Sequence, residues 1–157
     1  MQKFELEGLF DFLNKGVSAF HSAAAAAAIL EANGYEERPE SAAWELVPGG
    51  KYYTTRNGSA VLAWRMPKGA LTGWHVTASH SDSPVFKLKP QAESPAAEKY
   101  LRLNVERYGG MIMSTWLDRP LSIAGRVLVR DGERIVTKLV DLGQVGGQAV
   151  LGRQLIK

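Results

Sequence analysis

One segment of this sequence points to an α/β fold: residues 74–84, Trp74-His75-Val76-Thr77-Ala78-Ser79-His80-Ser81-Asp82-Ser83-Pro84. Its first six residues are almost all apolar or small, which is typical of a β-strand that is covered on both faces. Open α/β sheets bind their ligands outside the carboxyl ends of the strands, and His80 and Asp82 follow directly at that end. We therefore predict a strand over residues 74–79 with a candidate site where it ends.

The spacing of His80 and Asp82 permits a metal site. Two residues apart on an extended backbone, their side chains project to the same side. A neutral imidazole binds a metal ion through one nitrogen, while a nearby carboxylate accepts the other N–H and orients the ring. A hydrogen-bonded histidine beside a turn-forming aspartate explains the same spacing, and the spacing alone favours this second explanation. His75 is offset by five residues and faces the opposite side of a regular strand, so we expect it to pack or hydrogen-bond within the sheet.

The sequence before this segment predicts two helices. Apolar residues recur at helical spacing over residues 4–13. Ser18 is a suitable N-cap for an alanine-rich helix that runs through Leu30. Asn33 and Gly34 then supply the left-handed conformation in which helices commonly end.

The remaining predicted elements are strands, turns and one linker. A strong hairpin signal, Arg56-Asn57-Gly58, lies between two of the strands. Residues 91–99 are polar and contain Ser94-Pro95, so we predict a linker there and a domain boundary between residues 92 and 93. The predicted strands besides 74–79 cover residues 44–47, 51–55, 59–64, 100–106, 121–130 and 134–140.

Composition excludes several classes of protein and of site. The formal net charge is +3 and the basic residues are scattered, so we expect no nucleic-acid partner. The chain has no cysteine, which excludes disulfides and thiolate metal sites and fits a cytoplasmic location. The longest apolar run, residues 23–30, is far shorter than the roughly 20 residues that span a bilayer, so we expect no membrane partner.

Two longer motifs carry a family resemblance. Residues 73–90 read Gly-Trp-His-Val-Thr-Ala-Ser-His-Ser-Asp-Ser-Pro-Val-Phe-Lys-Leu-Lys-Pro. Residues 105–127 read Val-Glu-Arg-Tyr-Gly-Gly-Met-Ile-Met-Ser-Thr-Trp-Leu-Asp-Arg-Pro-Leu-Ser-Ile-Ala-Gly-Arg-Val. In this order they resemble the metal-ligand strand and the next signature of the aspartyl aminopeptidase family of zinc metallopeptidases. The resemblance extends over roughly residues 8–141.

The resemblance implies a fold and an activity. It implies an α/β chain: residues 1–92 would be the N-terminal part of a mixed-sheet catalytic domain, and residues 93–157 the start of an inserted β-rich dimerisation domain. It implies a hydrolase that removes N-terminal, acidic residues from peptide substrates with two zinc ions per complete site. His80 would be a zinc ligand and Asp82 the carboxylate that orients it. The family forms homo-oligomers built from dimers.

The sequence departs from the family at its end. No histidine follows His80, and residues 142–157 do not resemble the family, whose further ligands and general base lie in a longer C-terminal portion. We therefore expect a truncated chain that is inactive alone and self-associates through its exposed strand edges. A short, non-catalytic assembly partner or regulator of a full-length aminopeptidase is the alternative. A generic α/β binding module, with a structural His80, is the third interpretation.

Overall fold

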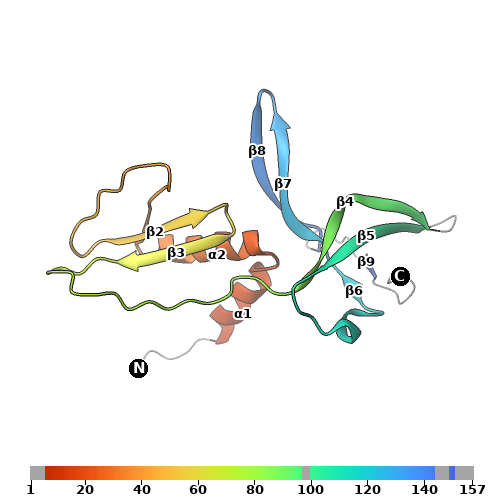
Figure 1. Cartoon of the computed structure of the whole chain (residues 1–157), viewed down its shortest axis with the longest axis horizontal. Coiled ribbons are helices and arrows are strands. Elements are labelled where there is room, and N and C mark those ends of the chain that lie inside the picture. The colour runs from red at the N-terminus through yellow and green to blue at the C-terminus, as the bar shows by residue number, and fades with distance from the viewer. Residues whose placement is uncertain (1–5, 97–99, 144–148, 151–157) are drawn as a thin grey trace. The chain divides into compact units, whose positions relative to one another are not determined.

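The computed structural model describes residues 6–96, 100–143 and 149–150 (Figure 1). Its contacts divide the chain into two compact units. The first comprises residues 1–82 and 124–140, and the second comprises residues 83–123 and 141–157. The boundary predicted between residues 92 and 93 falls inside a strand of the second unit, and the domain assignment made from the sequence stays a prediction.

Two helices open the first unit, α1 (Leu6–Lys15) and α2 (Ala19–Ala32). Ser18 caps α2, because its hydroxyl oxygen accepts the backbone N–H of His21 at 3.4 Å. Gly34 follows the helix with a φ of 78°, a left-handed conformation that glycine adopts without strain. Both predicted helices are confirmed, and each helix begins and ends within a few residues of the predicted positions.

The sheet of the first unit has the order β1-β2-β3. Its strands are β1 (Glu36–Glu37), β2 (Lys51–Arg56) and β3 (Ala60–Arg65). β1 pairs parallel to β2, and β2 pairs antiparallel to β3 through a turn in which Asn57 (φ 55°) and Gly58 (φ 64°) are both left-handed. These angles define the hairpin turn that matches the twist of the strands, so the predicted hairpin is confirmed.

The core of this unit lies between α2 and the sheet, where Figure 1 shows the helix against β2 and β3. Ala23 and Tyr53 belong to this core and are each 2% exposed, whereas Tyr52, also 2% exposed, lies on the opposite face of the sheet against Trp64. The Tyr53 hydroxyl donates to Glu31 Oε1 at 2.5 Å, which ties the middle strand to the helix. The alanines of α2 therefore allow the close approach of helix and sheet as well as favouring the helix itself.

The predicted strand over residues 44–47 is absent. Trp44 stacks on Trp64 of β3 with ring centroids 5.1 Å apart, and the Val47 N–H donates to the Tyr52 hydroxyl at 2.9 Å. These contacts fix the segment through side chains, so it covers the sheet as a loop and pairs with no strand of the described residues.

The strand predicted over residues 121–130 is divided between the two units. β7 (Ala124–Asp131) pairs with β8 (Arg134–Asp141) in the first unit, while β6 (Pro120–Leu121) pairs with β9 (Ala149–Val150) in the second. Arg126 of β7 donates to the Asn57 carbonyl at 2.8 Å and lies over the Phe20 ring, 4.3 Å from its centroid. The β7–β8 hairpin is thereby attached to both α2 and the β2–β3 turn.

The second unit is built on a long antiparallel pair, β4 (Val85–Ala96) and β5 (Tyr100–Tyr108). The linker predicted at residues 91–99 is wrong as far as Ala96, because these polar residues belong to β4, and residues 97–99 lie outside the described residues. The register of the β4–β5 pair shifts between Leu88 and Glu93, so the ladder is irregular where the polar part of β4 begins. A 3₁₀ turn, η1 (Met113–Trp116), places Trp116 edge-on to Phe86.

The strand predicted over residues 74–79 is absent from the structure. Residues 74–79 form no helix and no paired strand, and Val76 is 81% exposed and Trp74 56% exposed. A strand needs a neighbour for its backbone N–H and C=O groups, and none of the described strands pairs with this segment. The described residues thus combine helices with parallel and antiparallel strand pairs, as an α/β chain does, while residues 74–79 pair with none of the described strands.

Candidate functional site

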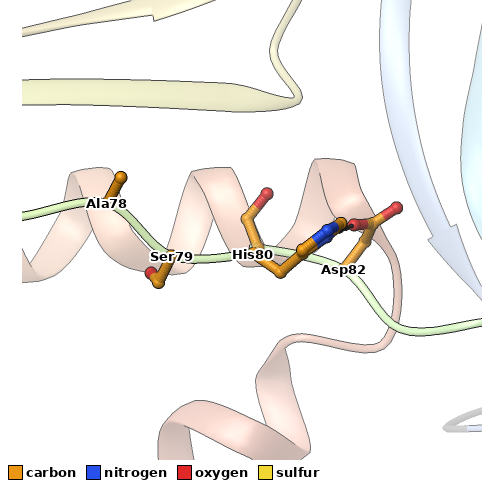
Figure 2. Close-up of a pocket in the computed structure, with 5 residues that line it drawn as sticks. Ala78, Ser79, His80 and Asp82 are labelled. Atoms are coloured by element: carbon orange, nitrogen blue, oxygen red, sulfur yellow. Dashed lines mark hydrogen bonds and ion pairs between the residues drawn. The ribbon is translucent and has the colours of Figure 1, made fainter.

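The structure brings the two predicted site residues together. His80 Nδ1 lies 3.1 Å from Asp82 Oδ1. Figure 2 shows the imidazole ring and the carboxylate turned toward each other along an extended backbone. The alternation of side chains along that backbone produces this contact, since residues i and i+2 lie on one side.

The two partners differ in exposure. The His80 side chain is 93% exposed and the Asp82 side chain is 30% exposed. Both line a surface hollow formed by five consecutive residues, Ala78 to Asp82. The carboxylate is therefore the partly covered member of the pair, and the imidazole reaches outward from it.

The contact selects one arrangement of the ring. When Nδ1 carries the proton of a neutral imidazole, it donates to Asp82 and leaves the lone pair of Nε2 free for a metal ion. Because the ring is exposed, a ligand or a metal reaches Nε2 without displacing a side chain. The arrangement fits one zinc ligand whose orientation a carboxylate supports.

The donor set around His80 is small. Within the described part of the chain, no group of three or more histidine, cysteine, aspartate or glutamate side chains lies close enough to hold a metal ion. A zinc site uses at least three protein ligands. The residues present therefore fit a fraction of a zinc site.

The other two histidines are kept apart from this pair. His21 lies in α2, where its Nδ1 is 2.7 Å from the Ser18 hydroxyl. His75 is exposed, so the expectation that it packs within a sheet is wrong, because the strand that was to hold it is absent.

One contact near the site was not predicted. The Ser81 hydroxyl donates to the Ser59 carbonyl at 3.4 Å and attaches the segment to the β2–β3 hairpin. Ser81 is the residue between His80 and Asp82, and its neighbours along the sequence gave no sign of a partner 22 residues away.

None of the helices that the structure describes is long and apolar enough to cross a membrane.

Comparison with known proteins identifies a family. Residues 12–145 match the family described as aminopeptidase I zinc metalloprotease (M18). A probable M18 family aminopeptidase 2 of Clostridium novyi is 40% identical over 141 residues, which cover 87% of this chain and 32% of the relative. Its counterpart in Pseudomonas putida is 43% identical over 136 residues, covering 85% of this chain and 32% of the relative. The chain thus spans about a third of the length of these relatives.

Two solved structures are similar to this chain in fold and in sequence. The mApe1 protein of Chaetomium thermophilum has a TM-score of 0.79 and 37% identity, covering 86% of this chain and 32% of that one. The mApe1 dodecamer of S. cerevisiae has a TM-score of 0.76 and 33% identity, with the same two coverages of 86% and 32%.

Proposed function

The chain belongs to the aminopeptidase I zinc metalloprotease (M18) family, and on this premise we propose that it carries the N-terminal part of an aminopeptidase active site, with His80 as one zinc ligand. The observation that carries the proposal is the contact of 3.1 Å between His80 Nδ1 and Asp82 Oδ1 inside the matched region. Residues 1–92 would belong to the catalytic domain, and residues 93–157 would begin an inserted β-rich dimerisation domain.

The two residues have different roles in this proposal. His80 presents Nε2 to the metal, and Asp82 holds the ring through Nδ1, which keeps the proton on the nitrogen that faces away from the metal. Zinc, when bound, polarises a peptide carbonyl and lowers the pKa of a bound water. The exposed position of His80 leaves room for a peptide to approach, and the partly covered Asp82 keeps the imidazole from rotating away.

The substrate and the assembly extend the proposal further. We assign peptides with a free amino terminus, preferably acidic, as substrates of a site that holds two zinc ions. Support comes from the names of the relatives, which are aminopeptidases. We also assign a homo-oligomer built from dimers, supported by the dodecamer of the S. cerevisiae protein. A cytoplasmic location is consistent with a chain that has no cysteine.

The chain alone is expected to be inactive. One imidazole does not hold zinc firmly, and the described residues bring no further pair of ligands near it. The remaining ligands would then come from a partner polypeptide or from sequence beyond this part of the family.

Metal binding and hydrolysis test the proposal together. Paramagnetic Co²⁺ is titrated into the chain while the ring protons of all three histidines are followed by NMR. We expect His80 to broaden at the lowest metal concentration, and Asp82→Asn to raise that concentration by about tenfold, as the loss of an orienting carboxylate does. Asp-, Glu- and Leu-chromogenic amides with added Zn²⁺ are expected to stay intact.

His75→Ala is the matched control, because it removes an exposed imidazole from the same segment. His80→Ala is expected to abolish the metal response, and His75→Ala is expected to preserve it. Equal broadening of His75 and His80 in the wild-type chain would contradict a special role for His80. Hydrolysis that His80→Ala eliminates would support the role of His80 but would show that the site is complete in this chain.

A further inference from the structure

Two Asn-Gly dipeptides occur in this chain, Asn33-Gly34 directly after α2 and Asn57-Gly58 between β2 and β3. An asparagine followed by glycine is the sequence in which a backbone nitrogen most readily attacks the preceding side-chain amide, because glycine has no Cβ to hinder the approach. All four residues are exposed, so water reaches both dipeptides. A difference in reactivity between them must therefore come from their hydrogen bonds.

Asn33-Gly34 is held by the end of the helix. The Asn33 side-chain Nδ2 donates to the Ile29 carbonyl at 2.8 Å, and the Gly34 N–H donates to the Glu31 carbonyl at 2.9 Å. The nitrogen that would attack keeps its proton in one hydrogen bond, and the amide that it would attack is turned back toward the helix by the other. A reaction at this dipeptide requires both hydrogen bonds to break.

Asn57-Gly58 has neither restraint. Its turn is closed by the Ser59 N–H, which donates to the Arg56 carbonyl at 3.1 Å. Among the described residues, no hydrogen bond engages the Gly58 N–H or the side-chain amide of Asn57. A Cβ built on Gly58 would meet nothing within 4 Å, so the space around this nitrogen is open. The Gly58 nitrogen and the Asn57 side chain are therefore free to approach each other.

A cation also acts on the attacking group. Arg126 Nη1 donates to the Asn57 carbonyl oxygen at 2.8 Å, and the guanidinium is held there by its position over the Phe20 ring. That carbonyl belongs to the same peptide group as the Gly58 nitrogen. When this nitrogen loses its proton, the negative charge is shared with the carbonyl oxygen, and a charged donor at that oxygen stabilises it.

We propose that Asn57-Gly58 is a site of spontaneous deamidation that Arg126 promotes. The Gly58 nitrogen gives its proton to water and forms a bond to Asn57 Cγ. The bond between Cγ and Nδ2 then breaks, and Nδ2 takes up a proton from water and leaves as ammonia. The chain is left with a succinimide ring. Water opens this ring at either of its carbonyls, which gives aspartate or isoaspartate at position 57.

The isoaspartate product changes how β7 is attached to the turn. In isoaspartate the peptide bond runs through the former side chain, and the former Asn57 carbonyl becomes part of a free carboxylate. Arg126 then faces a negative charge in place of a neutral acceptor, and a charge-assisted hydrogen bond is the stronger of the two. The contact between the β2–β3 turn and the β7–β8 hairpin thus becomes an ion pair.

Mass spectrometry of the aged protein provides the test. The whole chain is incubated in mildly alkaline buffer, and chymotryptic peptides that contain position 33 or position 57 are followed for the mass gain of an amide that becomes an acid. In the folded chain, Asn57 should deamidate about tenfold or more faster than Asn33, because hydrogen bonds protect only Asn33. In urea the two rates should become similar, since the dipeptides are identical.

Variants of Arg126 test the role of the cation. Arg126→Gln keeps a donor and removes the charge, so it should slow deamidation of Asn57 in the folded chain by about threefold, a small factor because the guanidinium is exposed. Arg126→Lys keeps the charge and should retain most of the wild-type rate. Neither variant should change the rates in urea. The rate at Asn33 and the far-UV circular dichroism spectrum check that each variant keeps the fold.

Three results would overturn the proposal. The first is a folded chain in which Asn33 and Asn57 deamidate at equal rates, because the hydrogen bonds would then not select the site. The second is a folded chain in which Asn57 stays intact over the time that urea-unfolded chains need to react. The third is a rate at Asn57 that Arg126→Gln does not lower, because the guanidinium would then take no part.

Discussion

Replacing Tyr53 with phenylalanine removes one hydroxyl from the core and leaves the packing of the ring unchanged. Tyr53 is 2% exposed, and its hydroxyl donates to Glu31 Oε1 at 2.5 Å. This hydrogen bond, with burial, raises the pKa of Tyr53 from 10.0 to about 12. The substitution therefore isolates the hydrogen bond that ties β2 to α2.

The magnitude follows from the pKa and from the exposure of the acceptor. A pKa that is higher by about two in the folded state corresponds to at most about 2.7 kcal/mol. Glu31 is exposed and regains water when the tyrosine hydroxyl is removed. We therefore expect Tyr53→Phe to lower the free energy of unfolding by about 1.5 kcal/mol, the lower end for a hydrogen bond to a charged group.

The raised pKa also predicts how the stabilisation by the Tyr53 hydroxyl depends on pH. Because the pKa is raised in the folded state, the stabilisation is fully present below pH 10 and is lost as the pH rises toward 12. Urea denaturation of both proteins, followed by circular dichroism at neutral pH and at several values above pH 10, measures the difference. Effects of pH that the two proteins share cancel in the comparison.

Glu31→Gln provides the control. It keeps an acceptor but removes the charge, and it should shrink the effect of Tyr53→Phe in a double-mutant cycle. A difference between the wild type and Tyr53→Phe that stays constant through pH 12 would refute the reasoning, because the hydrogen bond would then contribute nothing that depends on the proton.

Two further predictions concern the β2–β3 hairpin. Gly58→Val should lower the free energy of unfolding by about 1–2 kcal/mol, because Gly58 has a φ of 64° that a β-branched residue adopts only with strain. Thermal unfolding measures the change, and Asn57→Gly is a control that should not destabilise the protein. A Gly58→Val variant as stable as the wild type would contradict the turn geometry. Arg56→Gln should raise the pKa of Glu40 toward its usual value, because hydrogen bonds from the Arg56 guanidinium lower that pKa in the wild type. An NMR titration of Glu40 in both proteins measures the change. An unchanged pKa would show that the Arg56–Glu40 pair does not persist in solution.

The elements that the sequence predicted correctly depend on residues that are close together in the sequence. Ser18 lies directly before α2, and the left-handed Asn57 and Gly58 lie between the strands that they join. A cap or a turn is made by residues within a few positions of each other, so its conformation depends little on the rest of the chain. The His80–Asp82 contact belongs to the same class, since two residues separated by one position share one side of an extended backbone.

The errors concern segments whose conformation depends on a neighbour. Residues 91–96 include Ser94 and Pro95, yet they form part of β4, because residues 93–96 pair in register with β5. Trp44 has the composition of a strand residue but stacks on Trp64 and belongs to a loop. Strand propensity records how well a side chain fits a pleated surface, and it does not say whether a partner strand is present.

Residues 74–79 show both sides of this division. The sequence alone predicted that His80 and Asp82 lie on one side of an extended backbone, and it showed the family motif that surrounds them. It also predicted a covered strand over residues 74–79, and that prediction is wrong. Only the folded chain decided the surroundings of this segment. Val76 is exposed, and Ser81 is attached to the β2–β3 hairpin. Among the described residues, no group of three potential metal ligands forms around His80. Alternation along a backbone is a property of neighbouring residues, whereas strand pairing and metal coordination require groups that are distant in sequence to meet in space, and local sequence patterns do not encode that meeting.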